Sequence, residues 1–219
     1  MSSLQLPQSN LLKNRIQEEL KKRLVERDYF FMPQLNQFRR VTPTGFQSII
    51  LNWIPGEDVQ VLEVYLAVRH DAVEDLAEPF TSGLPEVQSS NFTLFTPLGN
   101  LFEQAVQRFN IYSEEDILPV VAALQKGILS RGISFLERYT RLENIDNLYN
   151  SDPNSPFAFL NSHLHRCMRA IAIARLSLRP DFELLAASYR EQLNQLGVTE
   201  MVLDRYDRLW RFLRTYSMN

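Results

Sequence analysis

The chain has 219 residues, of which 45% are hydrophobic and 22% charged, and its formal net charge is −3. This composition excludes a disordered chain, which would lack the apolar surface needed to offset the entropy of ordering. The acidic balance gives no overall electrostatic reason to bind nucleic acid, and one cysteine excludes an internal disulfide framework. Apolar runs are short and no signal peptide is visible, so we expect a cytoplasmic protein without a membrane span.

The first 96 residues predict one helix followed by strands. In residues 9–27, Leu12, Ile16, Leu20 and Leu24 recur at four-residue steps, which gives one apolar stripe. Further on, turn-forming residues separate runs rich in β-branched and aromatic side chains. We predict strands at residues 29–32, 37–41, 46–54, 59–69 and 92–96. Their short connections favour antiparallel neighbours, and the 59–69 strand has two apolar faces, as in the centre of a sheet.

Beyond residue 70 the pattern is mainly helical. Residues 98–112 fit either a helix or an extended segment. Ser113 is followed by three carboxylates, which predicts a capping box and a helix to about residue 130. The remaining helices are predicted at residues 71–80, 133–139, 142–149, 157–178 and 182–196 and from Thr199 onward, with a linker at 150–156.

These elements predict an α+β fold. An antiparallel sheet of four to five strands with an N-terminal helix packed on it is followed by a C-terminal helical bundle. We expect a sheet region at residues 1–112 and a helical region at 113–219, either as separate domains or packed as one unit.

Few motifs in the chain carry chemistry. The seven glycines are too widely spread for a phosphate-binding loop, and neither GxSxG nor HExxH occurs. His163 and Cys167 have the spacing of two metal ligands, but His165 points elsewhere on a helix, and a zinc site needs at least three protein ligands. We therefore interpret Cys167 as a packed apolar residue and expect neither a metal nor another cofactor.

Negative charge is concentrated in residues 57–86, where eight acidic residues stand against Arg69, for a local net charge of −7. The acids are Glu57, Asp58, Glu63, Asp71, Glu74, Asp75, Glu78 and Glu86. A solvated acidic edge accounts for this bias without a function. The alternative is a surface whose field steers a basic partner.

Arg69, His70 and Asp71 lie where the longest predicted strand gives way to a helix. Loops at strand ends are common places for functional residues, and Glu74 and Asp75 are near enough to take part in acid–base work. The structural interpretation is that Asp71 caps the helix and pairs with Arg69.

A row of four arginines follows one face of the last predicted helix. The row comprises Arg205, Arg208, Arg211 and Arg214. Asp204 and Asp207 interleave with it at the four-residue spacing of surface ion pairs. This pairing makes nucleic acid an unlikely partner for the row.

The stretches GFQSIILNW and VLEVYLAVRHDAVEDL, within residues 45–80, resemble small bacterial cytosolic domains of unknown function. Some of those domains are candidate immunity proteins found beside polymorphic toxins. The segment SEEDILPVVAALQKGILSRGISFLERY is similar to their C-terminal helices. The helices of residues 157–219 extend beyond such small domains. The resemblance implies an α+β scaffold without catalytic residues, and it carries over no site.

We therefore expect a non-catalytic protein-interaction module of the bacterial cytosol, with an immunity-like role as one form of it. The predicted binding residues for a basic protein partner are Arg69, His70, Asp71, Glu74, Asp75 and Glu78. The alternative is an enzyme whose site is assembled around Arg69, His70 and Asp71. A weaker alternative is a nucleic-acid adaptor that uses the terminal helix.

Overall fold

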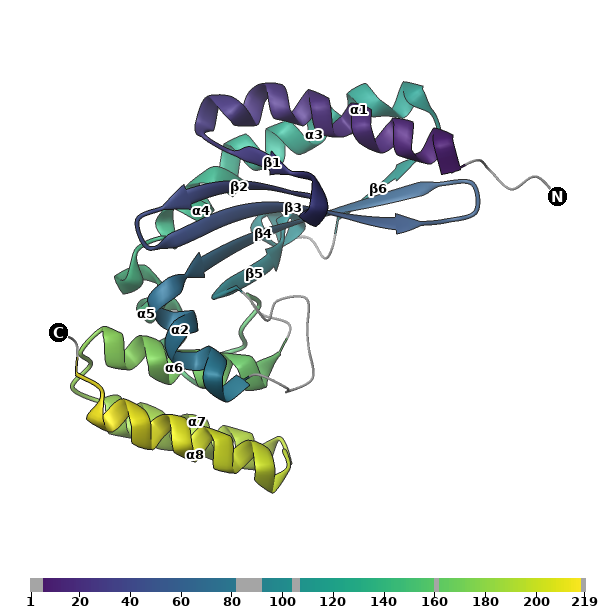
Figure 1. The fold of residues 1–219 in the computed structure, drawn as a ribbon. Helices are drawn as coiled ribbons and strands as arrows, with labels where there is room; N and C mark the ends of the chain where they lie inside the picture. Colours follow the sequence, from purple (N-terminus) through teal and green to yellow (C-terminus); the bar gives the residue numbers. More distant parts are fainter. Residues whose placement is uncertain (1–5, 82–91, 104–106, 160–161, 218–219) are drawn as a thin grey trace. The chain divides into compact units, whose positions relative to one another are not determined.

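The computed structural model describes residues 6–81, 92–103, 107–159 and 162–217. An N-terminal helix, an antiparallel sheet and several C-terminal helices make up the chain, which confirms the predicted α+β fold (Figure 1). No helix in the described ranges combines the length and the apolarity needed to cross a membrane.

The sheet contains six strands in the described part of the chain. They are β1 (Phe30–Met32), β2 (Gln37–Thr42), β3 (Gly45–Pro55), β4 (Gln60–His70), β5 (Leu94–Pro97) and β6 (Arg108–Ile111). Their order is β1-β2-β3-β4-β5, and β6 pairs with β4. The five predicted strands are present, and β6 lies in the segment whose sequence fitted both a helix and an extended chain.

Eight α-helices lie within the described residues. They are α1 (Leu6–Leu24), α2 (Asp71–Thr81), α3 (Ile117–Gly127), α4 (Ile133–Arg138), α5 (Leu142–Asn150), α6 (His163–Leu176), α7 (Phe182–Gln195) and α8 (Glu200–Thr215). A π-helical turn, Ile128–Gly132, joins α3 to α4. The predicted loop at residues 81–90 lies almost wholly outside the described residues.

The elements form two compact units. Unit 1 comprises residues 1–67 and 96–137, and unit 2 comprises residues 68–95 and 138–219. The boundaries between the units fall within β4, β5 and α4, each of which runs from one unit into the other. Each unit is therefore built from two separate stretches of chain.

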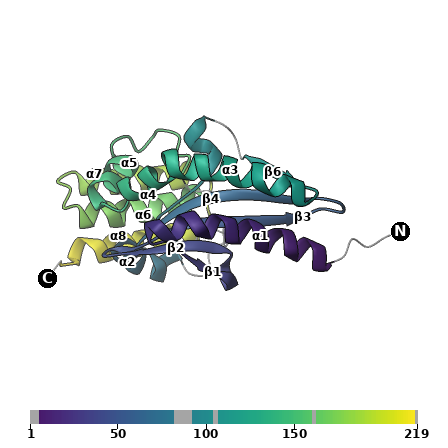
Figure 2. The same ribbon diagram turned by 90° about the horizontal axis from the view of Figure 1, so that it is seen from above.

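In unit 1, the apolar stripe of α1 is fully buried, as its four-residue spacing predicts. The strands β2 and β3 contribute Phe38 and Ile49, which are direct cross-strand partners and completely buried. Gln47 of β3 accepts a hydrogen bond from Tyr29 and donates one to the carbonyl of Leu136 in α4 at 3.1 Å. The helices α1 and α3 lie side by side (Figure 2).

In unit 2, α6 packs against α2, α5, α7 and α8, and residues 165–174 are buried on every side of the helix. The spacing of Leu160, Leu164, Cys167, Ile171, Ala174 and Leu178 predicts a single apolar stripe, which is wrong for this helix because it is buried all round rather than amphipathic. The helix begins at His163, six residues later than predicted. Leu178 lies two residues beyond its end, has a positive φ of 54° and is 70% exposed.

The predicted capping box lies on a 3₁₀ turn, Glu114–Asp116, that leads directly into α3. The hydroxyl of Ser113 accepts a hydrogen bond from the Glu115 N–H at 3.3 Å, and Asp116 accepts one from the Ser113 N–H at 2.9 Å. We expect Ser113→Ala to lower the free energy of unfolding by about 1 kcal/mol, because a helix-start N–H loses its acceptor. Urea unfolding measures this loss. Ser134→Ala, at an exposed position inside α4, is the control and should change stability little. An equal effect of both changes would contradict the capping role.

Candidate functional site

The junction between β4 and α2 carries most of the predicted binding residues. The Arg69 Nε donates to Asp71 at 2.8 Å, and its Nη2 lies 3.7 Å from Asp75. This ion pair agrees with the structural interpretation of Arg69 and Asp71. The carboxylates of Asp71 and Asp75 are exposed on the outer face of α2.

His70 is turned inward at the same junction and is only 6% exposed. Its backbone N–H donates to the hydroxyl of Thr93 at 2.9 Å, while its Nδ1 has no hydrogen-bond partner among the described residues. Burial lowers the pKa of His70 despite the opposing influence of Asp71 and Glu74. The imidazole and the Asp71 carboxylate therefore do not form the hydrogen-bonded acid–base pair that an enzyme would need there.

Glu74 lies on the inner face of α2 and is 2% exposed. Arg169 of α6, which is 1% exposed, binds both of its carboxylate oxygens, with Nε–Oε1 and Nη2–Oε2 distances of 2.8 Å. The hydroxyl of Thr93 donates to the same carboxylate at 2.7 Å, and Tyr149 donates to the Thr93 carbonyl. The result is a buried, bidentate ion pair that joins α2, β5, α5 and α6.

The acidic surface predicted for residues 57–86 is therefore divided. Glu63 and Glu74 are buried, and Glu86 lies outside the described residues. Glu57 and Asp58 are exposed in the turn between β3 and β4, in unit 1. The remaining carboxylates of the segment, Asp71, Asp75 and Glu78, belong to unit 2 and are exposed on the outer face of α2. The expectation that Glu74 contributes to a surface is wrong, because its carboxylate is fixed by Arg169.

A second buried carboxylate, Glu63, lies on β4 in unit 1. It accepts hydrogen bonds from Arg108 Nε at 2.8 Å, Tyr65 Oη at 2.7 Å and Asn52 Nδ2 at 3.1 Å. Burial acts to raise the pKa of the carboxyl group, but the three hydrogen bonds outweigh it and leave the pKa below its ordinary value. Burial and Glu63 together raise the pKa of Tyr65 to about 12. Glu63 is therefore a fixed anion that joins β3, β4 and β6.

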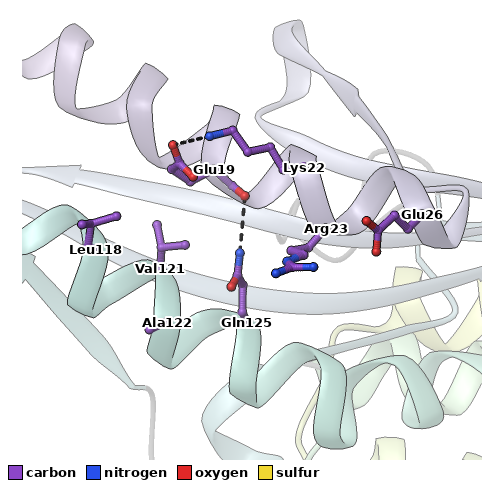
Figure 3. A pocket seen from close by; sticks show the side chains of 8 residues that line it. All are labelled: Glu19, Lys22, Arg23, Glu26, Leu118, Val121, Ala122 and Gln125. Atoms are coloured by element: carbon purple, nitrogen blue, oxygen red, sulfur yellow. Dashed lines mark hydrogen bonds and ion pairs between the residues drawn. The ribbon is translucent and has the colours of Figure 1, made fainter.

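A groove of about 500 Å³ lies between α1 and α3 in unit 1 (Figure 3). Its α3 side is formed by Leu118, Val121, Ala122 and Gln125, and its α1 side by Glu19, Lys22, Arg23 and Glu26. One wall is thus mainly apolar and the other is charged. No local sequence pattern indicates this groove, because it depends on how two helices distant in sequence pack together.

Two arginines of the row on α8, Arg208 and Arg214, are paired with acidic side chains. Arg208 pairs with Asp204 at 3.3 Å, and Arg214 pairs with Glu183 of α7 at 2.6 Å while its guanidinium lies over Trp210. Arg211 donates to the carbonyl of Asp207 at 3.3 Å. These contacts favour surface ion pairing over a nucleic-acid interface.

Cys167 is buried in α6, and burial raises the pKa of its thiol to about 12. His163 lies 2.9 Å from Gln192 through its Nε2. Across the ranges that the structure describes, no group of three or more His, Cys, Asp or Glu side chains could hold a metal ion.

Comparison with known proteins does not add a family. Neither protein-family models, nor curated proteins, nor solved structures give a match to the chain. Function must therefore be inferred from the geometry described above.

The buried ion pair predicts a specific pattern of stability. Arg169→Met should lower the free energy of unfolding by about 3–5 kcal/mol, because Glu74 is left buried without a counter-charge. The double variant Glu74→Leu with Arg169→Met should recover most of that loss. Urea unfolding compares the variants, with Arg208→Met as the exposed control, for which we expect a change below about 1 kcal/mol. A double variant less stable than Arg169→Met alone would contradict this.

The Glu63 cluster predicts a pH dependence. The pKa of Glu63 is lower in the folded chain than its unfolded value of about 4.3, so the hydrogen-bonded anion contributes fully above that value. The contribution is lost as the pH falls through the folded pKa. Glu63→Gln should therefore lose less stability than the unmodified protein between pH 5 and pH 3, as measured by urea midpoints. Glu57→Gln, in an exposed turn, is the control, and a matching flattened profile there would rule out this role for Glu63.

Proposed function

We propose that the protein is a non-catalytic protein-interaction module that binds a basic partner through the outer face of α2. The observation that carries the proposal is that the carboxylates of α2 differ in exposure. Asp71, Asp75 and Glu78 face solvent, whereas Glu74 is locked beneath them by Arg169. The three exposed carboxylates recur at steps of four and three residues and therefore form one stripe.

The anchoring of α2 supports a recognition role. A partner loses less affinity to conformational ordering when it meets side chains held on a rigid element. The buried ion pair fixes the rotation of α2 about its own axis, so the stripe keeps one orientation relative to α6. Arg69 compensates Asp71 and, at 3.7 Å, part of Asp75. The stripe therefore keeps a net negative charge, which favours a cationic partner.

The state of the reactive groups supports a role without catalysis. The carboxylates of Glu63 and Glu74 are each occupied by an arginine, and His70 is buried with a lowered pKa. The Cys167 thiol is buried, and its raised pKa leaves it without thiolate character near neutral pH. None of these groups combines exposure with a base or acid at hydrogen-bonding distance, which is what a catalytic pair requires.

A test removes the negative charge of the stripe without changing its shape. In the triple variant Asp71→Asn, Asp75→Asn and Glu78→Gln, we expect at least a tenfold loss of binding to a basic protein isolated with the unmodified chain from its source. Binding should also weaken steeply as the salt concentration rises, because exposed charges are screened. Affinity purification followed by quantitative binding measures both effects.

The matched control makes the same change of charge elsewhere. Glu57→Gln, Asp58→Asn and Glu143→Gln alter three exposed acids outside α2 and should leave binding unchanged. If the α2 variant and the control retain the same partners with equal affinity, the stripe is not the recognition surface. Thermal unfolding of both variants verifies that the fold is intact.

A further inference from the structure

The groove between α1 and α3 offers a mainly apolar wall to solvent. Leu118, the second residue of α3, is 69% exposed, and Ala122 is exposed one turn further along the helix. Val121, which is buried between them, forms the floor. Exposed apolar side chains that line a concave surface are typical of a docking site.

The charges on the α1 side of the groove are unequal in their pairing. Lys22 is bound to Glu19 at 2.6 Å. Arg15, which lies one turn before Glu19 on α1, is ion-paired with Glu114. Arg23 and Glu26, in contrast, form no ion pair with any described residue. Figure 3 shows Arg23 directed from α1 toward α3, beside Gln125. Along the groove, the apolar side chains are therefore followed first by Arg23 and then by Glu26, neither of which is held in an ion pair with a described residue.

The backbone of the groove decides what kind of segment fits it. The walls are α1 with the 3₁₀ turn that follows it (Val25–Arg27) and α3, so most of their N–H and C=O groups are bonded within their own helices. The Glu19 carbonyl also accepts a hydrogen bond from the Gln125 side chain of the other wall at 3.4 Å (Figure 3). An extended strand lying there would find no backbone partners, whereas a helix satisfies its own backbone. A third helix can also place its ridges of side chains into the groove between the first two.

We propose that this groove binds an amphipathic helix of another protein. Apolar residues of that helix at positions i and i+4 cover Leu118 and Ala122, an acidic residue about one turn further meets Arg23, and a basic residue beyond it meets Glu26. This site is separate from the stripe on α2, since it lies in unit 1. The stripe calls for a basic partner, whereas Arg23 in the groove calls for an acidic residue. It does not rest on the function proposed for α2.

The probe is a phage-displayed library of 16-residue helix-forming peptides, selected on the full-length chain with the Leu118→Glu variant as a soluble competitor. We expect the enriched peptides to share apolar residues at i and i+4 and an acidic residue three or four positions later. A synthetic peptide of the most enriched sequence is then measured by fluorescence anisotropy. Leu118→Glu should weaken its binding at least tenfold, because a carboxylate replaces the exposed apolar contact.

The matched control is Leu184→Glu on α7, where the leucine is 75% exposed and lies outside the groove. This variant should bind the peptide as the unmodified chain does. Arg23→Glu should weaken binding of the selected peptide three- to tenfold. A second peptide, with lysine in place of the acidic residue, should bind the Arg23→Glu variant about as tightly as the first peptide binds the unmodified chain, and it should bind the unmodified chain more weakly. Failure to enrich any peptide, an equal loss with Leu184→Glu, or no rescue by the lysine peptide would each overturn the proposal.

Discussion

The bidentate ion pair between Glu74 and Arg169 is the interaction on which the arrangement of unit 2 depends. Both side chains are almost completely buried, and together they connect α2 to the central helix α6. Two charges in a low-dielectric interior tolerate little displacement, because separating them leaves each without compensation. Thr93 adds a further donor to the carboxylate and accepts from the His70 backbone, so the end of β4 is tied to the same point. The orientation of α2 follows from this network.

Unit 1 uses a comparable device in a different way. Glu63 is also a buried carboxylate on a β4 residue, but its arginine partner, Arg108, is two-thirds exposed. The network therefore holds strands together at the boundary with solvent, whereas apolar residues from α1 and the sheet form the interior. Each unit thus contains one acidic residue of the segment 57–86, Glu63 or Glu74, as a buried anion with a structural role. The acids left at the surface are fewer and are placed on defined elements.

The sequence could predict the elements whose apolar periodicity is simple. The stripe of α1, the five main strands and the start of α2 all appear close to the expected bounds, because burial of one face or both leaves a regular pattern. The position of Glu74 was accessible in principle. It lies at the edge of the buried arc of α2, next to Thr81 and Ala77, where a charge that is buried needs a partner.

Other features depend on packing between distant segments and could not be read locally. Arg169 lies in a run that also contains His165 and Arg166 and is buried on all sides, and nothing in its local sequence identifies the acid that compensates it. The groove between α1 and α3 likewise exists only once both helices are in place. The strand β6 is short and pairs with residues 60–63 of β4, and its four residues carry too little pattern to separate strand from helix.

The spacing of the ion pair along the chain has a consequence for synthesis. Glu74 and Arg169 are 95 residues apart, so at about 5–20 residues per second the carboxylate waits roughly 5–20 s for its partner. Unit 1 needs nothing beyond residue 137 and has its full complement of residues earlier. On the ribosome, all residues of unit 1 are thus synthesised while α2 still lacks Arg169, the side chain that fixes its orientation. Until then, Glu74 on the inner face of α2 lacks its counter-charge, whereas Asp71 on the outer face already has Arg69. A premature stop before Arg169 would leave Glu74 in that state permanently.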